Sequence, residues 1–163
     1  MKNALLIIAA LASGIVSGLI SEETHSVWGS DGWFSHISPG ILFGIATAWF
    51  VVIEVNKKIV RGLSWIAISA AAFYIAVFCM MFGGFAGGTI LALTFPLIFE
   101  VKNKLSWQHI LSQIGMIAVL GIIGYLAIDS SYLFPVWQSV AAVCIISRIL
   151  LDKKIAARAI RTS

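Results

Sequence analysis

The sequence predicts an all-α polytopic membrane helix bundle with six transmembrane helices and both termini in the cytoplasm. Three observations predict it: the composition, six long apolar runs, and the placement of the Lys and Arg residues. Of the 163 residues, 60% are hydrophobic and 11% are charged, and the mean hydropathy is +1.01. Soluble domains have about 45–50% apolar and roughly 25% charged residues, so a soluble fold is excluded.

The apolar runs are long enough to cross a bilayer, because about 20 helical residues span its hydrocarbon. We expect spans at residues 4–20, 37–55, 63–82, 89–101 with some of the preceding glycines, 106–128 and 134–151. A signal peptide is the alternative for the first run, but that run continues past the candidate cleavage site, which favours a retained helix. Six spans use about 120 residues, so we expect residues 1–163 to form a single six-helix membrane domain.

Local signals refine these spans. Ser38 followed by Pro39 is typical of an N-cap and a first helical turn, so we expect the second span to begin there. The glycine-rich residues 83–88 predict a tight hinge, and Pro96 is expected to kink the fourth span. Residues 152–163 form a basic, mostly amphipathic tail, which we expect to contact anionic lipid headgroups.

The positive charges assign the two sides of the membrane. We assign every Lys and Arg to the cytoplasmic side, in Lys2, the turns at 56–61 and 102–104, and the tail. The charged residues on the opposite side are then all acidic, namely Glu22, Glu23, Asp31 and Asp129. We therefore expect a multi-pass protein of the cell inner membrane. Its main partner is the lipid bilayer, and its net charge of +4 reflects topology rather than nucleic-acid binding.

Small residues recur every four positions on the first two spans. They are Ala10, Gly14 and Gly18 on the first, and Gly40, Gly44 and Ala48 on the second. Such stripes let helix backbones approach closely in lipid. We expect both spans to make tight crossings, with each other or with a partner membrane subunit.

Residues 53–65 and 99–107 are similar, because an acid, two lysines and Leu-Ser-Trp recur in the same order. One interpretation is duplication of a helix hairpin. The other is common boundary chemistry, in which Glu54 and Glu100 pair with lysines about one helical turn away. Either acid could instead be a proton or cation site, because ionisable groups in spans are often functional. The boundary role is the simpler interpretation.

Polar side chains suggest a solute path. Ser112, Gln113 and Met116 share one face of the fifth span with His109, and Gln113 needs a hydrogen-bond partner in hydrocarbon. Near mid-membrane lie the hydroxyls of Thr47, Tyr74 and Thr94. Each hydroxyl can also bond its own helix backbone, so packing is the alternative to a cavity.

The longest predicted loop, residues 21–36, lies on the outer side. One hypothesis is a lid over an outward-facing pocket, with candidate residues His25, Trp28, Asp31, Trp33 and His36. The alternative is that the Trp and Phe side chains of the loop dip into the membrane interface. Its acids and histidines are of metal-ligand type, but their spacing matches no zinc or copper motif. We therefore expect no metal.

The sequence lacks the motifs of several common classes of enzyme and binding site. The sequence contains no P-loop, HExxH, CxxC or GxSxG, so we expect no cofactor and disfavour an enzyme. Cys79 and Cys144 lie in apolar runs and are expected to be packing residues. The leading hypothesis is a carrier for a small-molecule solute, or the membrane subunit of a transporter. The alternative is an accessory or assembly protein that docks a larger membrane complex through its small-residue helix faces.

The predicted architecture is generically similar to the substrate-binding subunits of energy-coupling vitamin transporters. The likeness rests on six helices, internal termini, a small-residue stripe on the first span and a longer outer loop after it. It covers architecture and no diagnostic motif, so it implies a fold and names no substrate.

Overall fold

The computed structural model describes residues 2–28, 33–52, 58–99, 107–128 and 131–162, and within these ranges the chain is helical without strands. The elements are α1 (Lys2–Trp28), α2 (Trp33–Val52), α3 (Lys58–Phe78), the short η1 (Met80–Phe82), α4 (Gly83–Ile98), α5 (Trp107–Ala127) and α6 (Leu133–Thr162). The predicted all-helical class is confirmed.

Five stretches of the described chain are long and apolar enough to cross a membrane: those in α1, α3, η1 with α4, α5 and α6. The remaining helix, α2, is 20 residues long and is not among these five stretches. Large apolar side chains on the outside of the bundle, such as Leu5 and Leu126, are 68% and 73% exposed. Such a surface suits lipid tails rather than water, and it fits a multi-pass membrane protein.

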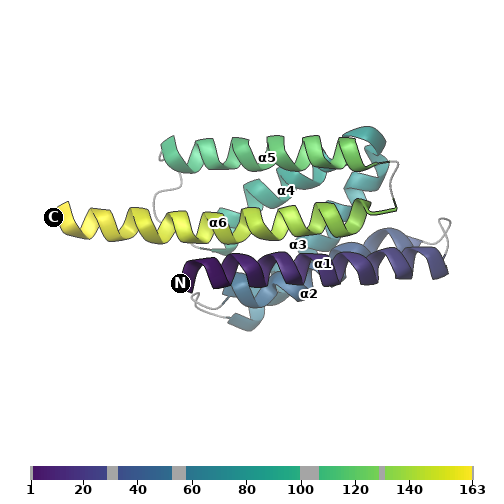
Figure 1. Cartoon of the computed structure of the whole chain (residues 1–163), viewed down its shortest axis with the longest axis horizontal. Helices are drawn as coiled ribbons and strands as arrows, with labels where there is room; N and C mark the ends of the chain where they lie inside the picture. Colours follow the sequence, from purple (N-terminus) through teal and green to yellow (C-terminus); the bar gives the residue numbers. More distant parts are fainter. Residues whose placement is uncertain (1, 29–32, 53–57, 100–106, 129–130, 163) are drawn as a thin grey trace.

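The six α-helices close a ring. Each packs against the next along the chain, and α6 packs against α1 and, less extensively, α2. In Figure 1, α6 lies between α5 and α1, and both chain termini lie at the same end of the bundle. Among neighbouring helices, α1–α6 and α2–α3 make the largest interfaces and α5–α6 the smallest.

Aromatic side chains fill the interior in two groups. Phe43, Phe73 and Trp137 join α2, α3 and α6, with ring centroids 4.9 to 6.4 Å apart. Nearer the termini, Trp65 of α3 packs edge-on against Phe95 of α4. These large rings contribute van der Waals contact, which holds helices together where lipid supplies no hydrophobic drive.

The outer loop predicted at residues 21–36 is wrong in its bounds. Helix α1 continues to Trp28, and α2 already begins at Trp33. The hydroxyls that suggested a loop instead bond the helix itself: Ser21 to Ser17 O, Thr24 to Ile20 O and Ser26 to Glu23 O. Hydroxyls satisfied in this way do not end a helix.

The predicted start of α2 at Ser38 is also wrong. Pro39 lies inside the helix, where it has no N–H to donate to the carbonyl of Ser35. Ser35 and Ser38 are 0% and 4% exposed. Their burial between helices shows that tertiary packing stabilises these first turns despite the proline.

The glycine-rich residues 83–88 form the first turns of α4 rather than a hinge. The turn lies just before them, where Met80 has a positive φ of 47°. A Cβ on Gly84 would lie 2.6 Å from Leu120 O and 2.9 Å from Gly124 Cα. Glycine is therefore required here because the backbones of α4 and α5 touch. At the other end of the chain, residues 152–162 continue α6 as a helix.

Candidate functional site: a six-helix apolar pocket

The end of the bundle opposite the termini contains a pocket of about 340 Å³. Every α-helix of the ring contributes to its lining, which consists of His25, His36, Phe73, Ala76, Val77, Met80, Gly83, Gly84, Gly124, Ile128, Leu133, Phe134 and Trp137. The lining is mostly apolar and aromatic, with two histidines as its polar members. Size and lining match small-molecule sites found between helices of bundles.

His25 is the unusual polar group of this pocket. Its Nδ1 is buried and has no hydrogen-bond partner among the described residues. The ring packs edge-on against Phe134 at 5.7 Å and lies 6.4 Å from the ring of His36. Leaving a buried polar atom unpaired costs about 1–3 kcal/mol. A ligand that hydrogen-bonds to Nδ1 removes this cost.

One turn before His25 on α1, a carboxylate oxygen of Glu22 is also buried without a described partner. Glu22 Oε2 and His25 Nδ1 therefore do not bond to each other. In the part of the chain that the structure describes, no three His, Cys, Asp or Glu side chains come together as a metal site would require.

Trp137, which forms the floor of the pocket, contacts several neighbouring side chains and one backbone carbonyl. Trp137 donates its indole N–H to Leu120 O at 3.0 Å, and its ring is held by Phe43 and Phe73. The rim is formed partly by Met80, whose left-handed backbone is costly for a residue with a side chain. The structure thus combines a packed aromatic floor with a strained turn at the entrance.

The predicted lid residues divide into three groups. His25 and His36 line the pocket from α1 and α2. Trp33, also on α2, is 68% exposed and is not part of the lining. Trp28 ends α1, and Asp31 lies outside the described residues. The lid itself stays a prediction, although two of its residues meet at one pocket.

The predicted mid-membrane hydroxyls of Thr47 and Thr94 are hydrogen-bonded, and the ring of Tyr74 packs against a neighbouring ring. Thr47 donates to Phe43 O and accepts the indole N–H of Trp65 at 2.9 Å. Thr94 donates to Ile90 O of its own helix, and Tyr74 is 36% exposed with its ring against Phe78. None of these hydroxyls is part of the pocket lining.

The predicted polar face of α5 lies away from the pocket as well. Gln113 donates to Ala92 O over 3.5 Å, which is at the limit of a hydrogen bond. Met116 is buried in the core at 3% exposure, and Ser112 is half-buried. The solute path through these residues stays a prediction, since the structure does not bring them into one cavity with the hydroxyls.

A buried polar network was not anticipated from the sequence. Gln138 of α6 is fully buried; its Oε1 accepts from Ser17 Oγ at 2.6 Å, and its Nε2 donates to Ser21 Oγ at 3.0 Å and Pro39 O at 3.3 Å. The network joins α6 to α1 and α2. The missed signal was a glutamine inside an apolar run, the same signal that identified Gln113.

Arg148 corrects the charge assignment. It was placed with the cytoplasmic tail, but it lies inside α6 and is 3% exposed. The charged tail of the helix begins one turn later, at Asp152. The Oδ1 atom of Asp152 lies 3.3 Å from His109 Nε2 of α5. The available signal was an arginine among isoleucines and leucines, four positions before the tail begins at Asp152.

The two small-residue stripes lie at internal helix crossings, each with a different neighbour. A Cβ on Gly14 would lie 2.7 Å from Gln138 O, and one on Gly18 would lie 2.5 Å from Pro135 N, both on α6. On α2, a Cβ on Gly44 would lie 2.7 Å from Ile66 Cα of α3. Gly40 also faces α3, Ala10 is fully buried, and Ala48 packs against the core.

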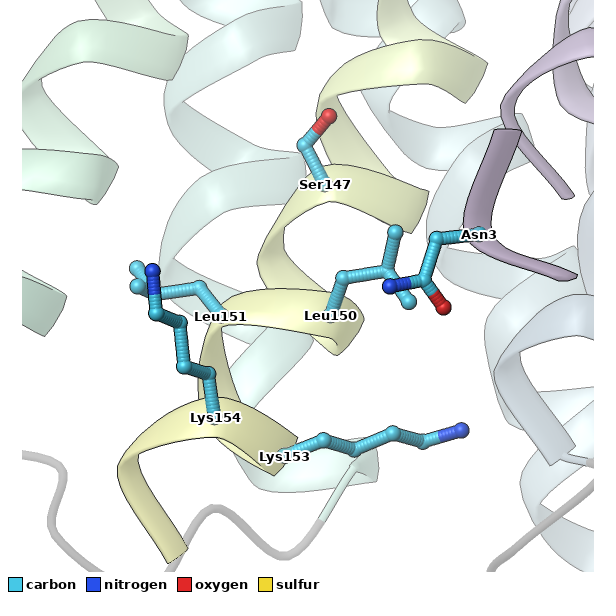
Figure 2. Close-up of a pocket in the computed structure, with 6 residues that line it drawn as sticks. All are labelled: Asn3, Ser147, Leu150, Leu151, Lys153 and Lys154. Atoms are coloured by element: carbon cyan, nitrogen blue, oxygen red, sulfur yellow. The ribbon is translucent and has the colours of Figure 1, made fainter. Parts of the chain in front are cut away.

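A second hollow lies on the surface near the termini. Figure 2 shows Ser147, Leu150 and Leu151 along α6, with Lys153 and Lys154 extending to either side and Asn3 of α1 beside Leu150. This groove, of about 520 Å³, combines leucines with lysines at one end of the bundle. That is the composition of a surface that meets lipid headgroups.

Glu54 and Glu100 lie outside the described residues, as do the rest of residues 53–57 and 100–106 in the two similar segments. Their boundary role and the internal duplication therefore stay predictions. Comparison of the chain with protein-family models, curated proteins and solved structures finds no match.

Proposed function

We propose that this chain is a six-span membrane protein that binds a small, largely apolar molecule, acting as a carrier or as the membrane subunit of a transporter. The pocket lined by all six α-helices carries the proposal. Its aromatic walls favour an apolar body, and the unpaired His25 Nδ1 favours one hydrogen-bonding group on that body. A ligand that touches every helix of the ring can bias how those helices are arranged, as transport requires.

The proposed orientation places the pocket at the outer side. Lys58, Lys153 and Lys154 lie at the opposite end, where cytoplasmic charges belong. In this arrangement α2 also crosses the membrane, which gives six spans. The glycine stripes favour the solute-binding hypothesis over the accessory one, because Gly14, Gly18, Gly40 and Gly44 are used inside the bundle rather than offered to a partner.

The topology is tested with two single cysteines, in a variant whose Cys79 and Cys144 are replaced by alanine. Val27 lies in the last turn of α1 with 71% exposure, and Lys58 begins α3 at the other end of the bundle. We expect Val27→Cys to react with a membrane-impermeant maleimide in intact cells and Lys58→Cys only after permeabilisation. Labelling of both cysteines from the same side would contradict the proposed orientation.

Binding is tested with 1-naphthol, a neutral aromatic body with one hydroxyl group, on the purified chain in detergent. We expect saturable quenching of tryptophan fluorescence, because Trp137 lines the pocket. Val77→Phe should weaken the affinity at least about tenfold, because its ring fills the pocket; tenfold corresponds to about 1.4 kcal/mol. Val119→Phe is the matched control, since Val119 lies on α5 with 42% exposure against 39% for Val77.

The role of His25 is tested by comparing 1-naphthol with naphthalene. In the wild-type protein we expect a preference for naphthol, because its hydroxyl can pair with Nδ1. His25→Phe should remove the preference while leaving naphthalene binding within about twofold. Equal quenching of the wild-type and Val77→Phe proteins would show that the probe partitions into detergent and that the pocket does not bind it.

A further inference from the structure

The guanidinium group of Arg148 is buried in the bundle and makes few hydrogen bonds. The residue is 3% exposed, and its Nη1 lies 3.5 Å from Ala92 O, at the limit of a hydrogen bond. Its Cζ lies 5.1 Å from the ring centroid of Phe95. Nε and Nη2 are both buried and have no hydrogen-bond partner among the described residues. A guanidinium carries five donors, so most of its capacity is unmet.

Among the described residues, the one acceptor that Arg148 reaches is available because of Pro96. Four residues after Ala92, the proline has no N–H to donate, so the Ala92 carbonyl is free to accept from other helices. Gln113 Nε2 and Arg148 Nη1 both approach it, each at 3.5 Å. Two long hydrogen bonds to one carbonyl, which carries no charge, do not neutralise the positive charge of Arg148.

Asp152 supplies a neighbouring negative charge, but it makes no described hydrogen bond to Arg148. Asp152, one turn further along α6, acts on Arg148 through its charge. Its Oδ1, however, lies 3.3 Å from His109 Nε2 of α5, and no hydrogen bond joins it to Arg148 in the described part of the chain. A charged group inside a membrane bundle is costly unless paired and is commonly functional. The positive charge of Arg148 is therefore only partly balanced.

We infer that Arg148 is the recognition group of an intramembrane oxyanion site at the junction of α4, α5 and α6. The two unpartnered nitrogens, Nε and Nη2, form one edge of the guanidinium and can bind the two oxygens of a carboxylate or phosphate group side by side. The least extensive of the neighbouring-helix interfaces, α5–α6, adjoins this junction.

This site is separate from the apolar pocket. Arg148 follows the pocket residue Trp137 by eleven positions on the same helix, which corresponds to about 16 Å along the axis. The inference therefore does not depend on the proposed function, and either can fail without the other.

The test uses the purified full chain in uncharged detergent at constant ionic strength set with chloride. Its thermal midpoint is measured against increasing inorganic phosphate, dihexanoyl phosphatidic acid or dihexanoyl phosphatidylcholine. We expect a saturable rise of the midpoint with phosphatidic acid or inorganic phosphate and none with phosphatidylcholine. A response to inorganic phosphate identifies a free anion as sufficient, whereas a response to phosphatidic acid alone identifies a lipid headgroup.

Two variants assign the effect to Arg148. Arg148→Met should weaken the dissociation constant at least about tenfold, and its midpoint without ligand should equal or exceed that of the wild type, because a buried unbalanced charge is replaced by an apolar chain. Lys154→Met removes one exposed charge from the same helix and should leave the constant within about twofold.

Three results would overturn the inference. One is the absence of saturable stabilisation by either phosphate probe. Another is equal stabilisation of the wild-type and Arg148→Met proteins, or equal stabilisation by phosphatidylcholine. The third is an Arg148→Met protein that fails to fold or melts well below the wild type without ligand, because the guanidinium would then be a structural group.

Discussion

Gly14→Leu is expected to destabilise the bundle by at least about 3 kcal/mol, more than most overpacked cores. Even a Cβ at this position would lie 2.7 Å from Gln138 O, and it also meets the backbone of Ser139. Backbone atoms cannot rotate away, so α1 and α6 must separate along one of the two most extensive interfaces of the ring. In detergent, the thermal midpoint followed by circular dichroism should fall by about 6–12 °C.

Gly115→Leu is the matched control. Gly115 lies on α5, and a Cβ there would meet nothing within 4 Å. The same substitution should therefore change stability by less than about 1 kcal/mol, since most surface changes lie within about 0.5 kcal/mol. Similar midpoints for the two variants would mean that α1 and α6 are not in close contact in the folded protein.

The helices could be predicted from the sequence because each needs only local information. A run of about 20 apolar residues must be helical in lipid, where no other open structure satisfies the backbone. The ends of the helices could not be predicted as well. Ser21, Thr24 and Ser26 look like loop residues in isolation, and only their bonds to preceding carbonyls show that α1 continues.

The glycine stripes showed where close crossings would form but not which helices would meet. Gly14 and Gly44 each carry the same small-residue signature, yet one faces α6 and the other faces α3. Partner choice depends on the ring closing between α1 and α6, which are far apart in sequence. A local pattern contains no information about that closure.

The pocket was only partly predictable. Its histidines were identified because His25 and His36 are conspicuous polar residues near helix ends. Its walls come from apolar side chains such as Phe73 and Trp137, which look like any other core residues in the sequence. Arg148 was missed for the opposite reason: its closeness to Lys153 and Lys154 made it look like part of a solvated tail, although it is buried.

Gln138 and Gln113 are both glutamines within apolar helices, and they differ in how well their side-chain amides are hydrogen-bonded. The two residues therefore allow a direct comparison of a well-bonded amide with a weakly bonded one. Gln138 makes three hydrogen bonds of 2.6 to 3.3 Å to α1 and α2. Gln113 makes one bond, of 3.5 Å, to α4. Interhelical hydrogen bonds in lipid contribute about 0.6 kcal/mol each on average, so the number and length of bonds should separate the two residues clearly.

Gln138→Leu is therefore expected to lower the free energy of unfolding by about 2 kcal/mol, and Gln113→Leu by no more than about 0.5 kcal/mol. The same side chain is introduced in both variants, so differences in apolar transfer largely cancel. In the first variant Ser17 can donate its hydroxyl hydrogen to Gly14 O instead, and Ser21 keeps its bond to Ser17 O, which limits the cost. Both free energies can be measured by denaturant titration in mixed micelles. A larger loss for Gln113→Leu than for Gln138→Leu would show that the α4–α5 contact, rather than the α1–α2–α6 network, is the principal polar link between helices.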